Sequence, residues 1–389
     1  MNTLGYARFV YDQPYLNSFI RHYESLGFKK ILLLFHESFL LDKKIKEILD
    51  KDKISSEISI RVKKKLIEKK VLDKKYLNND SVILHPVRNY KDGLISKFSH
   101  VIPDDTEWVL NIDSDEYLLI NNKYKNIDEL LGEALKRKPK LECFQFKWIW
   151  ITNSIHAKSK SLQETIKKHD CYETKRVKSH YVFSIKTFQR YSKGLEFTCH
   201  CAKKNVNRYE KYAISEYYDG YKVPDKNLHV DRDTLGVIVH MRLRSLNNLI
   251  FKCVNIFQRS VPSKNAAMED NKIINYLSKS KIGERDSEKV FMDLYDLNIL
   301  DYEKRHISNV ISRGGLIMEN YNNCISESSI ELFDKSREEK YYMEWIKKHL
   351  SKKVTDEELE NVMYNIKSLN KILEDLKEVE NKDLNIFIS

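Results

Sequence analysis

Three acidic residues, Asp113, Asp115 and Glu116, follow directly on an apolar run in the stretch WVLNIDSDEYLLI, residues 108–120. The run has the length and two-sided hydrophobicity of a strand buried within an α/β sheet. Side chains two apart on extended backbone point the same way, so Asp113 and Asp115 are expected to direct both carboxylates into one small space. Oxygen ligands of this kind suit Mg²⁺ or Mn²⁺, which completes its shell with phosphate oxygens. The stretch therefore predicts a site for a cation and a diphosphate.

The alternative for the same acids is a solvated turn, because Asp-x-Asp also occurs by chance. Two features of the context favour the metal site. The acids follow a buried run, and ligands of open α/β sheets gather at the carboxyl ends of the strands. The segment also becomes apolar again at Tyr117, Leu118 and Leu119, so that the acids form a short polar stretch between two apolar segments expected to be buried.

The stretch WVLNIDSDEYLLI resembles the DxD segment of GT-A glycosyltransferases of the family 2 and family 92 type. Two further stretches are similar to that group and follow in its order, PYLNSFIRHYESLGFKKILLLFHES at 14–38 and VIVHMRLRSLNNLIFKC at 237–253. The resemblance implies a GT-A-like α/β fold, with a mostly parallel sheet flanked by helices. It also implies a glycosyltransferase of the hexosyltransferase type that uses Mn²⁺ or Mg²⁺ and a nucleoside-diphosphate sugar, above all a UDP-sugar, in glycan or polysaccharide synthesis.

Several site residues are carried over from this resemblance. Asp113, Asp115 and His240 are the expected metal ligands, with two alternatives left open: Asp113 as a contact of the donor's ribose, and His240 as a phosphate contact. The apolar run 237–239 delivers the imidazole of His240 at its end, and neutral imidazole suits Mn²⁺. The group's usual residues in the first turn and after the second strand are replaced here by Tyr11-Asp12 and His36-Glu37-Ser38. The identity of the donor's nucleotide base is therefore left open. The residues expected to bind the donor are Asp12, Glu37, Asp113, Lys186, Arg244 and Lys252.

An inverting reaction, which the resemblance also implies, needs a base within hydrogen-bond reach of the acceptor hydroxyl. The candidates are unranked: Asp231, Asp233, Glu196 and His200. Glu116 is expected to orient the motif rather than take part in the chemistry.

Composition sets the classes of partner. The chain has 389 residues, a net charge of +11 and a pI near 9.0, which favours anionic partners. The resemblance implies a glycan or lipid-linked acceptor, and the basic charge favours peripheral membrane contact; no nucleic acid is expected. A basic nucleic-acid-binding protein is the non-enzymatic alternative, and a metal-dependent nucleotidyl or phosphoryl transferase the enzymatic one. The latter is disfavoured because 10 glycines form no phosphate-cradling loop.

Cysteine usage and hydropathy indicate a cytoplasmic protein. The six cysteines form no C-x-x-C pair, and no apolar run or N-terminal leader of membrane type is found. A zinc site at Cys199-His200-Cys201 is an alternative whose spacing fits no usual pattern.

Periodicity predicts the elements that must position these residues. Residues 1–262 are expected to form the nucleotide-sugar-binding catalytic domain. Its strands are predicted at 3–10, 31–35, 81–87, 143–151, 183–191, 196–201 and 237–240, with helices from Leu16 to Gly27, at 92–100 and at 126–138. The resemblance implies an acceptor loop at 152–180. Residues 263–389 are predicted to be helical and to pack on that domain, associate with a second copy or rest on a membrane.

Overall fold

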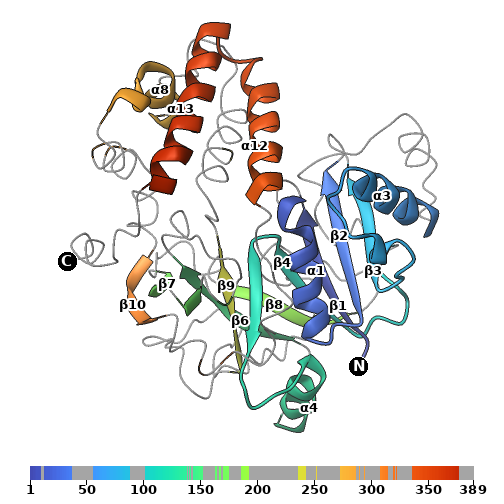
Figure 1. Ribbon diagram of the computed structural model, residues 1–389. Coiled ribbons are helices and arrows are strands. Elements are labelled where there is room, and N and C mark those ends of the chain that lie inside the picture. Colours follow the sequence, from blue (N-terminus) through green and yellow to red (C-terminus); the bar gives the residue numbers. More distant parts are fainter. Residues whose placement is uncertain are drawn as a thin grey trace. The chain divides into compact units, whose positions relative to one another are not determined.

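The computed structural model describes the strands and helices of a mixed α/β protein (Figure 1). The described residues are 1–9, 13–36, 56–87, 101–137, 139, 141, 143–151, 163, 166–167, 170–174, 185–191, 235–241, 251, 272–285, 289, 293, 307–313, 319, 321 and 335–375. The predicted helix at 92–100 and the predicted strand at 196–201 lie outside them. The predicted fold class, an α/β sheet flanked by helices and followed by C-terminal helices, is confirmed.

The first half of the sheet is parallel. It contains β1 (Thr3–Phe9), β2 (Lys30–His36), β3 (Val82–Val87) and β4 (Trp108–Asp113) in the order β4-β1-β2-β3. All three pairings run parallel. Both sides of these strands are covered, as their continuous apolar sequence predicts, and Leu4, Leu32 and Val109 share one buried cluster. The carboxyl ends of the four strands therefore lie along one edge of the sheet.

The second half adds antiparallel strands. β8 (Ile185–Arg190) lies between β4 and β6 (Cys143–Ile151) and is antiparallel to both. β7 (Asp170–Thr174) and β10 (Ile307–Arg313) extend the sheet beyond β6. β7 falls inside the predicted acceptor loop and β10 inside the predicted helical region, so both ranges contain a strand that the sequence did not reveal.

A short side branch of the sheet carries the acidic motif. β9 (Gly236–His240) runs parallel to β6 and antiparallel to β5 (Glu116–Ile120). β5 has no strand partner other than β9 among the described elements. The residues that follow β4 therefore leave the parallel sheet and join the branch.

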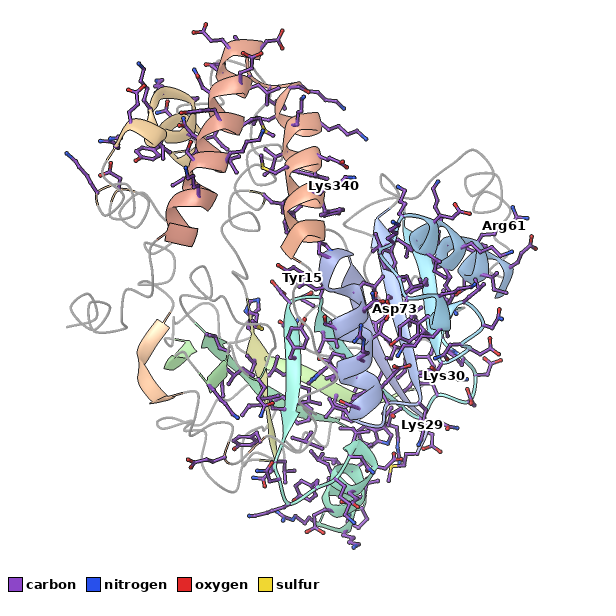
Figure 2. All side chains as sticks on the ribbon, in the orientation of Figure 1. Tyr15, Lys29, Lys30, Arg61, Asp73 and Lys340 are labelled. Carbon is purple, nitrogen blue, oxygen red and sulfur yellow. The ribbon has the colours of Figure 1, made fainter. Side chains whose placement is uncertain are left out.

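The helix α1 (Leu16–Ser25) connects β1 with β2 and packs against β2 and β5. Leu16, Phe19, Ile20 and Tyr23 are buried at the predicted helical spacing. Gly27 ends the segment with a φ of 87°, a left-handed conformation that suits glycine. The partly exposed side of α1 is tied to a loop, since Asp73, which is labelled in Figure 2, accepts hydrogen bonds from the Arg21 and Asn17 side chains.

Further short elements complete this part of the chain. α3 (Ser56–Glu68) packs on β3, and α4 (Ile127–Arg137) has Ile127, Leu130 and Leu131 buried, as its amphipathic pattern predicts. The 3-10 turns η1 (Gln13–Tyr15) and η3 (Lys74–Tyr76) precede α1 and β3.

The chain divides into two compact units. The first comprises Met1–Ile151, Ser159–Arg242 and Val310–Phe333; the second comprises Thr152–Lys158, Leu243–Asn309 and Asp334–Ser389. The division at residue 262 stays a prediction.

Helices build the described core of the second unit: α8 (Lys272–Lys279), α12 (Lys335–Leu350) and α13 (Asp356–Asp375), with the turn η8 (Ile282–Glu284). The Phe251 ring lies 4.3 Å from that of Trp345 and 4.9 Å from that of Tyr342, centroid to centroid. None of the described helices combines the length and the hydropathy that crossing a bilayer requires.

Candidate active site

The acidic motif lies on a bend between two strands. β4 ends at Asp113, Ser114 and Asp115 form a turn, and β5 begins at Glu116. The expectation that Asp113 and Asp115 share one extended backbone is therefore wrong, because the chain turns at Asp115 to reach β9. The two carboxylates instead have different neighbours: Asp113 contacts the side chain of a β8 residue, and Asp115 contacts a β9 residue.

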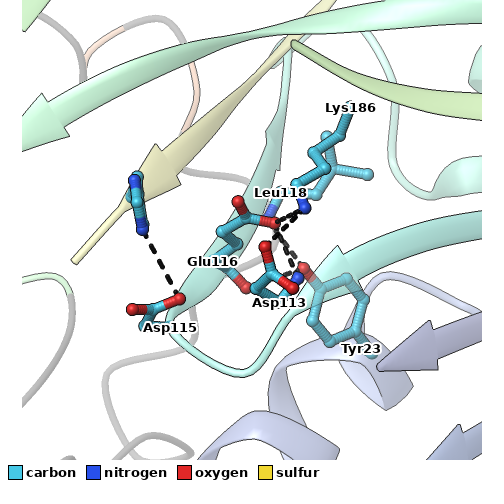
Figure 3. A network of polar contacts seen from close by, with 7 residues as sticks. Tyr23, Asp113, Asp115, Glu116, Leu118 and Lys186 are labelled. Atoms are coloured by element: carbon cyan, nitrogen blue, oxygen red, sulfur yellow. Dashed lines mark hydrogen bonds and ion pairs between the residues drawn. The ribbon is translucent and has the colours of Figure 1, made fainter. Parts of the chain in front are cut away.

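Asp113 and Glu116 share the ammonium of Lys186, which projects from β8 (Figure 3). Lys186 Nζ lies 2.6 Å from Asp113 Oδ2 and 3.1 Å from Glu116 Oε2. The side chains of Lys186 and Glu116 are 0% exposed, whereas that of Asp113 is 32% exposed. Glu116 Oε2 also accepts a hydrogen bond from the Asp113 N–H at 2.7 Å. Glu116 thus holds the backbone at the end of β4. Of the Asp113, Glu116 and Lys186 side chains, only that of Asp113 reaches the surface.

Burial decides the protonation of this cluster. It raises the pKa of Glu116 to about 8, and Asp113 and Asp115 act in the same direction against the pull of Lys186. Glu116 Oε1 is buried without a hydrogen-bond partner among the described residues, which adds to the cost of charging this carboxyl. Burial works against the charge of Lys186, but Asp113 and Glu116 outweigh it and raise the Lys186 pKa. The ammonium is therefore a fixed positive charge at the base of the motif.

Asp115 faces His240, the last residue of β9. Asp115 Oδ1 lies 3.5 Å from His240 Nε2, and the two side chains are 14% and 12% exposed. The pairing of β5 with β9 creates this proximity: Glu116 is the register partner of His240, and the Met241 N–H donates to the Asp115 carbonyl at 2.8 Å. A carboxylate oxygen and an imidazole nitrogen thus lie together where β9 ends and β5 begins, and both are atom types that bind divalent cations.

The other edge of β5 is held by α1 instead of a strand. The Tyr23 hydroxyl donates to the Glu116 carbonyl at 3.0 Å and accepts from the Leu118 N–H at 3.1 Å. His22 Nε2 lies 2.8 Å from the Leu118 carbonyl. His22 and Tyr23 are fully buried, and burial lowers the pKa of His22 to about 4, so the ring is neutral and donates this bond. The sequence placed both residues on the helix but gave no indication of this role.

Asp115 and His240 fit a divalent cation as an incomplete protein site. No three His, Cys, Asp or Glu side chains converge as a full metal site among the described residues. Two ligands that each lie about 2.1 Å from one ion are separated by about 3 to 4 Å, and the 3.5 Å between Asp115 and His240 falls in that range. The remaining positions suit phosphate oxygens and water, the usual shell of a substrate-bound Mg²⁺ or Mn²⁺.

Four of the predicted site residues meet in two separate pairs at the bend, Asp113 with Lys186 and Asp115 with His240. The contact of Lys186 is with the acids, and its contact with a phosphate stays a prediction. The others lie outside the described residues, namely Asp12, Glu37, Glu196, His200, Asp231, Asp233, Arg244 and Lys252, as do Cys199 and Cys201 of the zinc alternative.

The chain matches a known protein family over most of its length. The family model of glycosyltransferase family 92 matches residues 6–281, which include the bend, Lys186 and β9. No curated protein matches the chain.

Proposed function

Because this chain belongs to glycosyltransferase family 92, we propose that it moves a sugar from a nucleoside diphosphate to an acceptor hydroxyl, with a divalent cation held by Asp115 and His240. Glycosyl transfer follows from the family, while the cation, the donor and the stereochemistry are proposed. The observation that carries the proposal is the Asp115–His240 pair, which presents two suitable ligands within the matched region.

A bound cation would supply charge stabilisation of the diphosphate as the glycosidic bond breaks. The chain's own groups support the same step. Asp115 and His240 are mostly buried, so little water competes for the space between them. Lys186 fixes a positive charge beside Asp113, which offsets part of the repulsion between the acids and an incoming anion.

The donor is expected to be a UDP-sugar, and the acceptor a glycan or a lipid-linked sugar. An exposed carboxylate such as that of Asp113 can accept hydrogen bonds from hydroxyl groups of the donor. Inversion would require a base at the acceptor hydroxyl, for which Asp231, Asp233, Glu196 and His200 remain the candidates. Peripheral membrane contact and association through the C-terminal helices belong to the same proposal.

Thermal unfolding with a panel of UDP-, GDP-, CMP- and dTDP-sugars, each with and without Mn²⁺, tests the proposal. A ligand present at 100 times its Kd stabilises the folded state by about 2.7 kcal/mol. We expect one nucleotide to raise the Tm only when Mn²⁺ is present, and Asp115→Asn to lose this response. Asp105→Asn is the matched control, since Asp105 pairs with Lys30 at the surface. Absence of a response to every donor would exclude the donor assignment.

A further inference from the structure

The buried ammonium of Lys186 is a built-in cation next to the place where a metal ion is proposed. A lysine that is 0% exposed needs compensating partners, and Lys186 has them in Asp113 Oδ2 and Glu116 Oε2. Lys186 is anchored on β8, whose backbone pairs with β4 on one side and β6 on the other. Its position relative to the bend is therefore set by the sheet.

The two acids of the motif differ in what surrounds them. Asp113 is engaged at 2.6 Å by Lys186, while Asp115 points to the other side of the bend, toward β9 (Figure 3). The Asp113 backbone is also held, because its N–H donates to Glu116. A divalent ion at Asp115 would have to displace or repel the ammonium in order to recruit Asp113 as well, since both would be cations sharing one carboxylate.

From this geometry we propose that Lys186 is a positioning residue, which holds Asp113 against Glu116 and so keeps the Asp113 carboxylate from ligating the cation at Asp115 and His240. The proposal rests on the metal-dependent function proposed above. It assigns Lys186 a role at the base of the motif, in place of a contact with the donor's phosphates. Ligation then falls to Asp115 and His240, and Asp113 keeps a fixed, partly exposed carboxylate.

Affinity for Mn²⁺ without nucleotide, measured by electron paramagnetic resonance of the free ion, separates this role from a structural one. The Lys186→Met, Glu116→Gln double variant is compared with the Glu116→Gln single variant. Residue 116 is neutral in both proteins, so removal of Lys186 leaves no buried Glu116 carboxylate without a partner. We expect Lys186→Met to tighten Mn²⁺ binding about tenfold, because Asp113 becomes available as a further ligand. Adding Asp113→Asn should reverse the gain. A lysine that only stabilised the fold would leave the affinity unchanged or lower it.

Single variants test the same idea with Lys186 in place. Asp113→Asn should change the Mn²⁺ affinity less than about twofold, and Asp115→Asn should lower it at least about tenfold. Lys30→Met, at a surface lysine paired with Asp105, is the control for loss of a positive charge. Circular dichroism confirms that each variant is folded.

The outcomes separate the two proposals. If Asp113→Asn weakens Mn²⁺ binding as much as Asp115→Asn does, Lys186 does not keep Asp113 from the ion and its positioning role is overturned, although metal binding stands. Unchanged or weaker binding by the folded Lys186→Met protein overturns it equally. If Asp115→Asn leaves Mn²⁺ binding intact, the metal site itself is wrong, and both proposals fall.

Discussion

Glu116 and His240 are register partners across the antiparallel strands β5 and β9. This one pairing brings the acidic bend and the late histidine together, because Asp115 and His240 then flank the same end of the branch at 3.5 Å. Since β5 is paired with β9 on one edge and held by α1 on the other, changes at either edge should reach the site.

Tyr23→Phe tests the α1 edge. The variant removes the hydroxyl that bonds the Glu116 carbonyl and the Leu118 N–H, both in a buried environment. Leaving two buried backbone groups unpaired should lower the free energy of unfolding by about 2 to 4 kcal/mol, and turnover should fall as the bend loosens. Urea unfolding measures the first effect. Tyr364→Phe, at a side chain 58% exposed, is the control and should change little; a similar small loss for both would argue against the role of Tyr23.

His22 should make stability depend on pH. Burial lowers its pKa from 6.5 to about 4 in the folded protein, so the unfolded chain binds the extra proton between these values. Above pH 6.5 His22 is neutral in both the folded and the unfolded chain and costs no stability. As the pH falls toward 4, protonation of the unfolded chain lowers the free energy of unfolding by about 3 kcal/mol in total.

His22→Gln isolates this contribution, since the amide can still donate to the Leu118 carbonyl but does not titrate. Between pH 7 and pH 4 the unfolding free energy of the wild type should fall by about 3 kcal/mol relative to that of His22→Gln. Curves that stay parallel would show that His22 is not the titrating group.

Gly236 permits the close approach of β9 to β5. A Cβ at this position would lie 2.8 Å from the Leu119 carbonyl oxygen and 3.0 Å from Phe146 Cε1. Gly236→Ala should therefore destabilise by about 1 to 3 kcal/mol and weaken Mn²⁺ binding through the shifted β9. Gly132→Ala, inside α4, should instead stabilise by about 0.5 to 1 kcal/mol, because an added Cβ there would meet nothing within 4 Å beyond its chain neighbours and the backbone of its own helix. Equal effects on thermal unfolding would contradict the packing argument.

Asn365 holds the second unit together at the end of α8. Its amide donates to the carbonyls of Leu277 and Ser280 at 2.6 and 2.5 Å, and its oxygen accepts from the Ile282 N–H at 3.0 Å. Asn365→Ala should destabilise this unit by about 2 to 4 kcal/mol, seen as faster hydrogen exchange in α8 and α13. The exposed Asn361 of the same helix provides the control, Asn361→Ala, which should leave exchange unchanged. Unaltered exchange in Asn365→Ala would refute the assignment.

Local patterns in the sequence predicted much of the fold. The strand at 143–151 is observed at Cys143–Ile151, and the helix that Gly27 was expected to end is followed by that glycine at φ 87°. These features depend on periodicity and on backbone preference, which are properties of neighbouring residues.

The geometry of the site was harder to predict because it depends on pairings between distant segments. The flanks of the acids are apolar on both sides, so nothing in 108–120 shows that the chain leaves β4 at the bend to pair with β9. The alternation of side chains along a strand predicts the face of the sheet on which Lys186 lies, but not how deeply its side chain is buried. In the structure this side chain is fully buried against Asp113 and Glu116. Tyr23 looked like an ordinary core residue because its hydroxyl partners belong to β5.

Release of nucleoside diphosphate from the donor that stabilises the protein shows whether a cation at Asp115 and His240 is needed for transfer. The rate is measured for the wild type and for Asp115→Asn and His240→Gln, after EDTA treatment and after Mn²⁺ is restored. We expect EDTA to abolish release, Mn²⁺ to restore it in the wild type, and both variants to stay at least about 100-fold slower. Full activity of the EDTA-treated wild type, or of either variant, would contradict it.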